Sequence, residues 1–401
     1  MTEIPGRSAS PLTPSEQSPT ADRALLWALF FGNFVTGTGI LLPAGMLTDL
    51  AAGMDVSVAE AGKLLVFSGV VVAVGAPLIA AFTSHVDRRT MLLLALAIYL
   101  VTHTIAAFAP NFDVLIAARL AMGIAAAIFT PQAAATVGVL LPPQRRASAI
   151  TMIFIGWSLA TVGGMPLGGY VAHEYGWRVA YGIVAAMSLV AMLAVALTLP
   201  GGVRIPRLRL ASWISVATSP ALLLVLLVTV LNGTGQFTFF TYLNPSLKAS
   251  LGASAALLTF VLAWYGVSAT LGNLIASRFV GRLGTSRSAL VTLLAMAVGL
   301  TLWGAGAGTL WIVLVAGVLW GLGTFATNSI QQARLAGLAP DLTSASIALN
   351  TSLIYLGQAL GSGLGGVLIN DGYLPFLPWV AAAILVVAAG VSIAAMRWEH
   401  G

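Results

Sequence analysis

Residues 160–171 read ATVGGMPLGGYV, which places four glycines and one proline within twelve residues. Glycine and proline are the residues that interrupt regular structure most strongly. The run is therefore typical of a phosphate-binding loop, of a turn, or of a helix whose close packing requires small residues. The surrounding sequence decides among these three, and the fold with them.

The composition indicates that most of this chain does not face water. Of its 401 residues, 59% are hydrophobic and only 7% are charged, whereas charged residues make up about 25% of a soluble globular protein. Charged residues divide the chain into eleven neutral intervals, each long enough for the ~20 apolar residues of a membrane-spanning helix. The intervals are 24–48, 64–84, 90–112, 120–144, 147–173, 179–203, 210–247, 249–277, 288–333, 342–370 and 372–396.

The number of spans follows from the lengths of these intervals. The interval 288–333 accommodates two helices around the turn GAGAGT (304–309), so we expect twelve spans. The run 160–171 lies inside the interval 147–173, where lipid cannot satisfy the backbone of an open loop. It is therefore predicted to be helix, with glycines that allow a neighbouring helix to approach and with Pro166 bending the axis.

The basic residues predict the orientation in the membrane. With the N-terminus in the cytoplasm, fourteen lysines and arginines fall on the cytoplasmic side and four on the other. Cytoplasmic segments of membrane proteins carry such an excess. The four on the outer side are Lys63, Arg119, Arg178 and Lys248.

The chain divides into two similar halves. The longest polar break, 200–213, separates six predicted spans from six, and GGMPLGG (163–169) in the fifth is matched by GSGLGG (361–366) in the eleventh. Parallel repeats of six spans with a substrate site between them are a known transporter architecture. We therefore expect an all-α membrane protein with twelve transmembrane helices in two pseudo-symmetric six-helix bundles. Its predicted parts are a disordered cytoplasmic tail (1–23), the first bundle (24–199), a cytoplasmic linker (200–219), the second bundle (220–396) and a cytoplasmic tail (397–401).

Three motifs resemble one family. GGMPLGG (163–169), ARLAMG (118–123) and GAPLIAAFTSHVDRR (75–89) resemble motifs of the major facilitator superfamily, in its twelve-span drug:proton antiporter branch, and the resemblance covers about residues 24–396. It implies the twelve-helix fold of that superfamily and a monomer. The residues that it assigns to conformational motifs are Gly75, Arg88, Arg89, Gly123, Gly164, Pro166, Gly168 and Gly169.

The sequence departs from these motifs at two places. Met165 stands before Pro166 where a glycine is usual, and Ser84 and His85 stand where an acid and a base are expected. The second departure weakens the charge latch that the resemblance implies for the loop between the second and third spans.

No pattern in the chain is typical of an enzyme. There is no cysteine, no spacing of metal ligands and no phosphate loop with its lysine. We therefore expect no catalytic activity, no cofactor, no metal and no nucleic-acid partner. The expected partners are a small-molecule substrate, the lipid bilayer and protons.

A proton-coupled transporter usually carries a carboxylate inside a span, and this sequence has none. Arg119 is the strongest substitute, because an arginine in a neutral helix needs water or a partner. We expect Arg119, together with Asp113 or His103, to carry coupling. Asp49, at the end of the first span, is a further gating candidate, with a solvated helix cap as the alternative.

Amide and aromatic side chains inside the spans are the candidates for binding substrate, since a buried amide requires a polar partner. Asn232, Gln236 and Phe240 share one stripe of the seventh span by their four-residue spacing. A cavity of this uncharged kind suits neutral or weakly polar, fairly hydrophobic molecules. The full set is Asn33, Thr36, Gln132, Asn232, Gln236, Phe240, Trp264, Tyr265, Asn328, Gln332, Tyr355 and Gln358.

The sequence therefore leaves three functions to compare. The first is proton-coupled efflux of neutral amphipathic compounds by alternating access, in a bacterial inner membrane with both termini in the cytoplasm. The second is export or facilitated passage of a sugar, nucleoside or metabolite by the same fold. The third is a receptor or scaffold that transports nothing, although helices broken by glycine and proline would then have no purpose.

Overall fold

A computed structural model of the chain describes residues 19–83, 86–204 and 210–398, and within these ranges every regular element is a helix. Twelve of the helical segments are long and apolar enough to cross a membrane. The predicted all-α fold with twelve spans is therefore confirmed. The first half comprises α1 (Pro19–Gly45), α2 (Leu47–Gly53), α3 (Val58–Phe82), α4 (Arg88–Ala107), α5 (Phe112–Leu140), α6 (Pro143–Leu159), η1 (Ala160–Gly164), α7 (Met165–Tyr175) and α8 (Trp177–Thr198). The second half comprises α9 (Leu210–Thr218), α10 (Pro220–Phe240), α11 (Leu243–Leu251), α12 (Ala255–Leu283), α13 (Thr285–Gly306), α14 (Leu310–Leu338), η2 (Pro340–Leu342), α15 (Thr343–Asn370), η3 (Leu374–Phe376) and α16 (Leu377–Trp398).

The run 160–171 is helical, as predicted. It begins in a π-helical turn, η1, and continues into α7, so that α6, η1 and α7 form one span. The Met165 amide donates to the Ala160 carbonyl, five residues earlier. Pro166 has no N–H, which removes the bond that would hold the ordinary four-residue register here. Such π-turns are frequent at functional sites.

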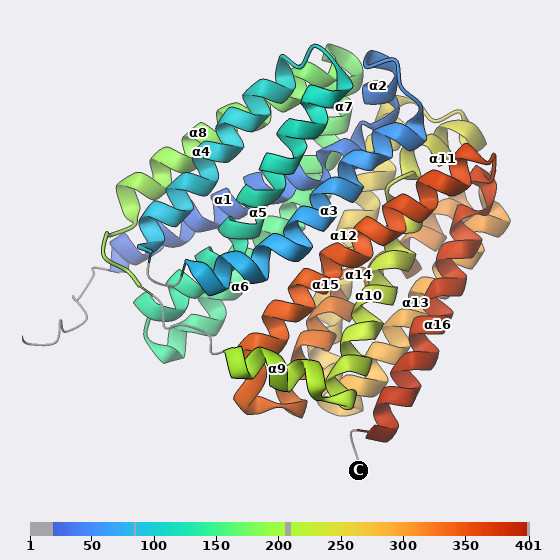
Figure 1. The fold of residues 1–401 in the computed structure, drawn as a ribbon. Coiled ribbons are helices and arrows are strands. Elements are labelled where there is room, and N and C mark those ends of the chain that lie inside the picture. Colours follow the sequence, from blue (N-terminus) through green and yellow to red (C-terminus); the bar gives the residue numbers. More distant parts are fainter. Residues whose placement is uncertain (1–18, 84–85, 205–209, 399–401) are drawn as a thin grey trace, which may run out of the picture.

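The two halves form two bundles that meet at one end and separate towards the other (Figure 1). Between the bundles, α3 packs on α15, while η1 and α7 pack on α12. We call the end that carries α2 and α11 the closed end. The opposite end, which carries α9 and the end of α16, is called the linker end (Figure 1).

Glycines allow this close approach between the bundles. A Cβ on Gly266 of α12 would lie 2.8 Å from the Val162 Cα of η1, and one on Gly69 of α3 would lie 2.8 Å from the Tyr355 carbonyl of α15. Real Cβ atoms are not found this close to backbone atoms. The Gly-rich fifth and eleventh spans thus both lie at the bundle interface, but each packs on another helix and not on its counterpart.

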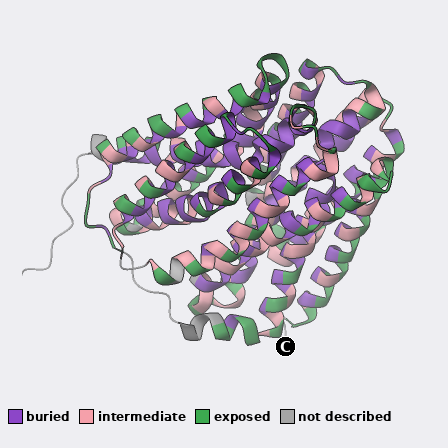
Figure 2. Ribbon diagram, turned by 45° about the horizontal axis from the view of Figure 1, so that its top comes forward, coloured by how far each residue is buried: buried purple, intermediate pink, exposed green. Residues whose placement is uncertain are grey.

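Apolar side chains cover the outer faces of the helices. Leu197 is 86% exposed, Trp311 76% and Phe82 72%, while buried residues line the inner faces (Figure 2). Apolar exposure on this scale is unfavourable in water and is expected of helices in lipid. The chain is therefore a multi-pass integral membrane protein.

Candidate functional site

Arg119 lies fully buried in α5 and connects that helix to α1 and α3. Its guanidinium donates to the Gly39 carbonyl at 2.7 Å and to the Ile40 carbonyl. It also donates to the Leu64 carbonyl at 3.2 Å and to the Ser68 hydroxyl at 3.3 Å. These acceptors are all uncharged, so backbone dipoles and a hydroxyl hold the positive charge in the interior. A buried ion requires such compensation.

Pro43 explains why α1 can supply one of these acceptors. In a regular helix the Gly39 carbonyl accepts from the amide four residues later, and in this chain that residue is Pro43, which has no N–H. The Gly39 carbonyl therefore remains available to Arg119.

His103 of α4 contacts the same part of α1. Its Nδ1 lies 2.8 Å from the Tyr99 carbonyl, so Nδ1 carries the hydrogen and Nε2 is left as an acceptor. Within the described residues Nε2 has no hydrogen-bond partner. A Cβ on Gly39 would lie 2.7 Å from this Nε2 atom. Gly39 thus has Arg119 on its carbonyl and His103 against its Cα.

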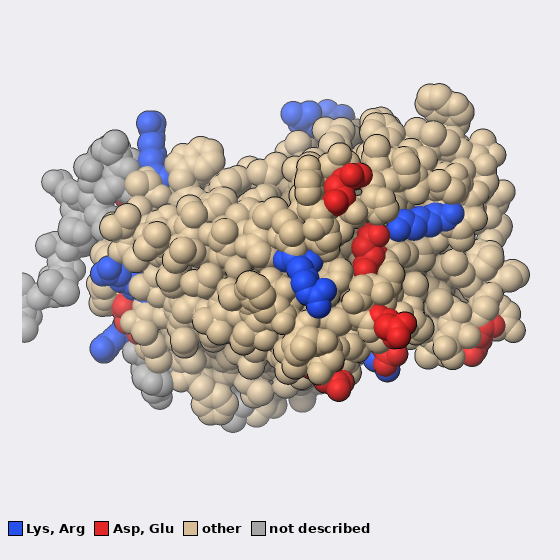
Figure 3. Space-filling model, turned by 90° about the horizontal axis from the view of Figure 1, so that it is seen from above, with Lys and Arg blue, Asp and Glu red and all other residues tan. Residues whose placement is uncertain are grey.

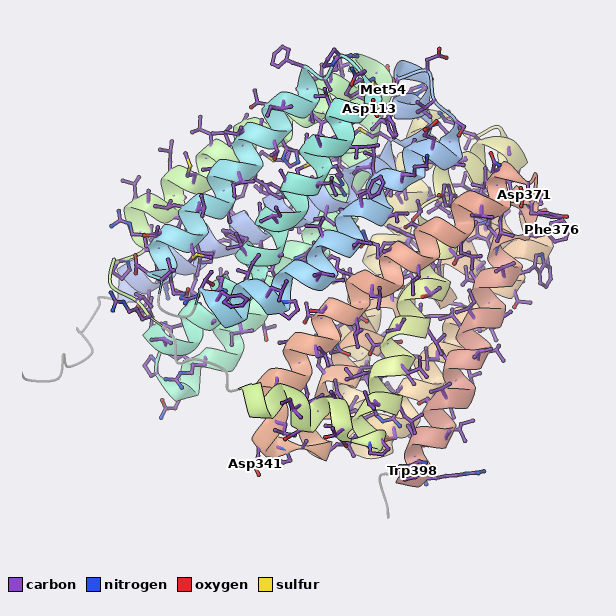
Figure 4. All side chains as sticks on the ribbon, viewed as in Figure 1. Met54, Asp113, Asp341, Asp371, Phe376 and Trp398 are labelled. Carbon is purple, nitrogen blue, oxygen red and sulfur yellow. The ribbon has the colours of Figure 1, made fainter. Side chains whose placement is uncertain are left out.

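Asp113 does not take part in this network. It lies near the start of α5, exposed at the closed end (Figure 4), and in the described part of the chain it forms no ion pair with Arg119. Of the two partners predicted for Arg119, the structure places His103 beside it and leaves Asp113 outside.

Asp49 of α2 joins the two bundles at the closed end. Its Oδ1 lies 3.1 Å from Nδ1 of His173 in α7 and 3.5 Å from Nζ of Lys248 in α11. Lys248 also donates to the Thr48 hydroxyl at 2.7 Å, and the Asn244 amide donates to the Gly45 carbonyl. Asp49 therefore lies in an inter-bundle contact and is not a solvated cap alone.

The face at the closed end carries few charges, as Figure 3 shows. Its acidic residues outnumber its lysines and arginines, six carboxylates against three cations. The cations are Lys63, Arg178 and Lys248, and the carboxylates are Asp49, Asp55, Glu60, Asp113, Glu174 and Asp371.

The arginines of the loop motif bind within the first bundle at the linker end. Buried Arg88 donates to Gln132 of α5 and, at 2.7 Å, to the Thr83 carbonyl. Arg89 donates to the Ala196 carbonyl at 2.7 Å. Gln132, predicted to bind substrate, thus has a partner in Arg88. Ser84 and His85 lie outside the described residues.

The motif glycines lie where helices of the first bundle pack. Gly75 and Gly123 lie at the contact of α3 with α5, and Gly164, Gly168 and Gly169 face α1. A Cβ on Gly169 would overlap the backbone of α1 at Gly45. A Cβ on Gly168 would meet the side chain of Leu42 in α1. Gly168 therefore packs within the first bundle.

The polar residues predicted in the first span bind other helices of the first bundle. The Asn33 amide donates to the Ile153 carbonyl at 2.9 Å and accepts from the Thr130 hydroxyl at 2.7 Å. Thr36 donates to the Gly32 carbonyl within α1. Asn33 therefore joins α1, α5 and α6.

An aromatic cluster occupies the second bundle. The Tyr265 hydroxyl accepts from Gln236 at 3.2 Å and lies 2.9 Å from the Thr324 hydroxyl. Its ring lies 5.4 Å from that of Phe240 and 4.4 Å from that of Trp320, between centroids. Three predicted residues, Gln236, Phe240 and Tyr265, are thus brought together.

The sequence prediction missed the large rings of this cluster. Trp303 lies 6.1 Å from Trp320 and 5.2 Å from Phe239, between centroids. Both tryptophans are fully buried, and neither indole N–H has a partner in the described residues. Tryptophan is rarely fully buried, so two tryptophans inside predicted spans could have indicated this cluster. The prediction selected amide side chains first and passed over them.

Buried amides of α10, α14 and α15 have atoms without partners. Asn232 donates to Asn328 at 3.5 Å, Asn350 accepts from Thr229 at 2.6 Å, and Gln331 donates to a carbonyl of α10. Their other amide atoms are buried and unpaired within the described chain. A buried unpaired amide costs about 1–3 kcal/mol, and a bound polar molecule would relieve that cost. Asn350 and Gln331 were not among the predicted site residues.

The remaining candidates lie apart from these clusters. Gln358 donates to the Leu65 carbonyl of α3 at 3.3 Å, across the bundle interface. Tyr355 and Gln332 are half-buried. Trp264 is 39% exposed on the outer face of α12, and its indole donates to the Leu314 carbonyl. Trp264 therefore faces away from the interior.

In the described residues no group of three or more histidines or carboxylates could hold a metal ion. A third buried arginine, Arg334 of α14, donates to the Ser392 hydroxyl at 2.9 Å and to its carbonyl at 3.2 Å. Arg334 was not among the predicted site residues.

Comparisons with known proteins agree with this architecture. The family model described as Major Facilitator Superfamily matches residues 29–243 and 225–400. The inner membrane transport protein YdhP of Escherichia coli (strain K12) is 30% identical over 362 residues, which cover 90% of this chain and 92% of YdhP. The uncharacterized MFS-type transporter YtbD of Bacillus subtilis (strain 168) is 28% identical over 366 residues, covering 90% of this chain and 92% of YtbD.

Solved structures show the same fold. A bacterial homolog of the human lysosomal transporter Spinster, inward-facing and unoccupied, matches with a TM-score of 0.74 at 18% identity, over 95% of this chain and 98% of its own. The nucleoside transporter NupG matches with a TM-score of 0.73 at 13% identity, over 94% and 99%. Two six-helix bundles, twelve spans and a family match over nearly the whole chain lead to one conclusion. The chain belongs to the major facilitator superfamily and is, by fold, a secondary transporter.

Proposed function

We propose that this protein exports neutral or weakly polar amphipathic molecules in exchange for protons, as the drug:proton antiporter branch does. The observation that carries the proposal is the uncharged cluster of the second bundle. Tyr265, Gln236 and Thr324 offer hydrogen bonds beside the rings of Phe240 and Trp320. Apolar surface with a few convergent polar groups suits such molecules, and an uncharged site would not balance an obligate dication.

We propose that the protein lies in a bacterial inner membrane with its linker end on the cytoplasmic side. YdhP, by its name, is an inner membrane protein. Eleven arginines of the described residues belong to the linker end, an excess that favours the cytoplasmic side. They are Arg23, Arg88, Arg89, Arg145, Arg146, Arg204, Arg278, Arg282, Arg287, Arg334 and Arg397. A substrate would then enter from the cytoplasm, where the bundles are apart.

The proposed coupling pair is Arg119 with His103. Both contact Gly39 of α1, and a proton would add at His103 Nε2, which has no hydrogen-bond partner among the described residues. Protonation would place a second positive charge near the buried guanidinium, and like charges at close range repel. That repulsion would loosen the hold of Arg119 on α1, which links proton entry to a change in the first bundle.

The test uses proteoliposomes with a trapped pH-sensitive dye, challenged with neutral antibiotics, sugars and nucleosides. We expect proton movement that depends on one class of compound. His103→Gln should abolish that movement, and the matched variant Asp113→Asn should leave it unchanged. Loss in Asp113→Asn with full activity in His103→Gln would overturn the proposed pair.

One observation favours a second function, a facilitator that moves a sugar, nucleoside or metabolite without protons. Within the described spans every carboxylate lies in a first or last turn of its span. If compounds cross the liposome membrane while the dye reports no proton movement, the facilitator is correct and the antiporter is wrong.

A further inference from the structure

One cavity lies outside the clusters of the proposed transport site. It has a volume of about 510 Å³ and lies between α3 and α15 near the closed end. Glu60 and Lys63 of α3 line it together with Ser57, the N-cap residue of that helix, and Gly363, Val367 and Asn370 line it from α15. The seam between these two helices lies on the front of the molecule in Figures 1 and 4. This is a lateral side of the transmembrane bundles, which faces the lipid.

Charged and amide side chains line the mouth of the cavity, whereas its deep end is uncharged. Glu60 and Asn370 lie at its closed-end mouth, whereas Val66 and Gly363 lie six to seven residues further into the helices. At 1.5 Å per residue this is a depth of about 10 Å. That depth is comparable to the polar headgroup layer on one side of a bilayer, about 5–8 Å.

The polar mouth carries one charge of each sign. Glu60 and Lys63 form an ion pair of 3.3 Å, and their side chains are 42% and 53% exposed. Exposed pairs of this kind hold together weakly, so each partner can accept a competing group. The mouth therefore suits a headgroup with an ammonium for Glu60 and a phosphate for Lys63.

The inner wall of the cavity is fixed by Tyr242. Its hydroxyl donates to the Ser362 carbonyl at 2.8 Å, and burial raises the pKa of this phenol, so it stays protonated. A Cβ on Gly366 would lie 2.8 Å from this hydroxyl. The wall is thus closely packed on the side of Tyr242.

Apolar surface continues from the deep end of the cavity. Val70 and Val74 of α3 are 45% and 56% exposed, and Leu360 and Leu364 of α15 are 50% and 37% exposed. These two stripes flank the seam on the path that an acyl chain would follow.

We propose that this cavity binds a membrane phospholipid whose headgroup contains both an ammonium and a phosphate. The lipid bridges α3 of the first bundle and α15 of the second, and so stabilises their contact at the closed end. This site does not depend on the proposed function, since it needs no transported substrate.

The test is photolabelling of the full-length protein in lipid nanodiscs. The probe is a phosphatidylethanolamine with a diazirine near the glycerol end of one acyl chain, and adducts are mapped by mass spectrometry of peptides. We expect adducts on the α3 and α15 segments that line the cavity. Gly363→Phe should abolish them, because a Cβ there meets only Val66, at 3.8 Å, and the added ring should occupy the cavity. The matched control is Gly390→Phe on α16, where a Cβ meets no atom within 4 Å.

The headgroup variants keep the proposal testable if Gly363→Phe does not fold. Glu60→Gln should lower labelling by phosphatidylethanolamine up to about fivefold, the worth of an exposed ion pair, and leave labelling by phosphatidylglycerol unchanged. Lys63→Gln should lower both. Equal labelling of all variants would mean that the lipid is only a neighbour in the bilayer, and the proposal would be wrong. Displacement of the probe by an exported compound, and not by unlabelled phosphatidylethanolamine, would assign the cavity to that compound and also overturn it.

Discussion

The two bundles share one framework but fill it differently. Helices α5 and α14 each contain 29 residues, and Arg119 is the eighth residue of the first while Gly317 is the eighth of the second. Arg119 binds carbonyls of two neighbouring helices. A Cβ on Gly317 would lie 3.6 Å from the ring of Trp303. One bundle thus has a buried cation where the other has a glycine beside an aromatic cluster.

Another pair of equivalent positions is polar in both bundles. Thr130 and Asn328 are the nineteenth residues of α5 and α14, and they hydrogen-bond to Asn33 and Asn232. The halves therefore retain a polar contact between equivalent helices and differ in charge. A charge held by fixed dipoles is costly to displace, whereas an uncharged aromatic cluster offers apolar area and ring contacts. The proposed coupling pair thus lies in the first bundle, and the proposed substrate cluster lies in the second.

The largest effect is expected from Arg119→Leu. Transport should fall about tenfold or more, since a lost interaction of about 1.4 kcal/mol in the rate-limiting step has that effect. Stability should also fall, by about 1–3 kcal/mol, because the buried Gly39 carbonyl loses its donor, so transport is compared at equal amounts of folded protein. Arg119→Lys is the control that retains the charge, but a single ammonium cannot span α1 and α3 together, so we expect partial activity. Wild-type transport by the leucine variant in proteoliposomes would contradict a functional charge in the first bundle.

Gly39→Ala should have the next largest effect. The added Cβ would lie 2.7 Å from His103 and 2.8 Å from the ring of Tyr99, and overpacking of this kind costs about 1–3 kcal/mol. Thermal unfolding in detergent should therefore show a lower Tm. Gly163→Ala in η1 is the matched control, because a Cβ there meets nothing within 4 Å. Equal Tm values for the two variants would show that α1 is not closely packed on α4.

These differences show how far the sequence could predict the molecule. Composition and neutral intervals suffice for twelve spans, because lipid leaves a hydrophobic segment almost no choice except a helix. The partners of Arg119 could not be predicted, since they are backbone carbonyls that carry no sequence signal. Pro43 was the one indirect sign, because it removes the donor that the Gly39 carbonyl would otherwise have. Trp264 was predicted as a site residue only because it is an aromatic residue inside a span. A span that is apolar on all its faces does not reveal whether a given ring faces lipid or the interior.

Tyr265→Phe tests the second bundle with a smaller effect. The variant keeps the ring and loses the hydroxyl that joins Gln236 to Thr324, at a cost of about 1 kcal/mol for each hydrogen bond. We expect a severalfold change in the KM of the transported compound and an unchanged proton stoichiometry. Tyr181→Phe is the matched control in the first bundle, since the Tyr181 hydroxyl is buried without a hydrogen-bond partner among the described residues. A changed stoichiometry in Tyr265→Phe would contradict the division of roles between the bundles.

The smallest effect concerns Asp49 of α2 and Lys248 of α11, which lie 199 residues apart in the chain. Their side chains are 20% and 30% exposed, so the pair should contribute about 0.2–1 kcal/mol to closure. A double-mutant cycle of Asp49→Asn and Lys248→Gln measures this coupling directly.

The readout is cross-linking of Ser57→Cys to Asn370→Cys by a flexible bifunctional maleimide, which the cysteine-free chain permits without background. Each single variant should reduce cross-linking as much as the double variant does, and 1 M salt should reduce it in the wild type, because the Debye length falls to about 3 Å. Additive effects of the two single variants would mean that Asp49 interacts with His173 instead, and that the closed end is held by packing of α3 on α15 and not by charge.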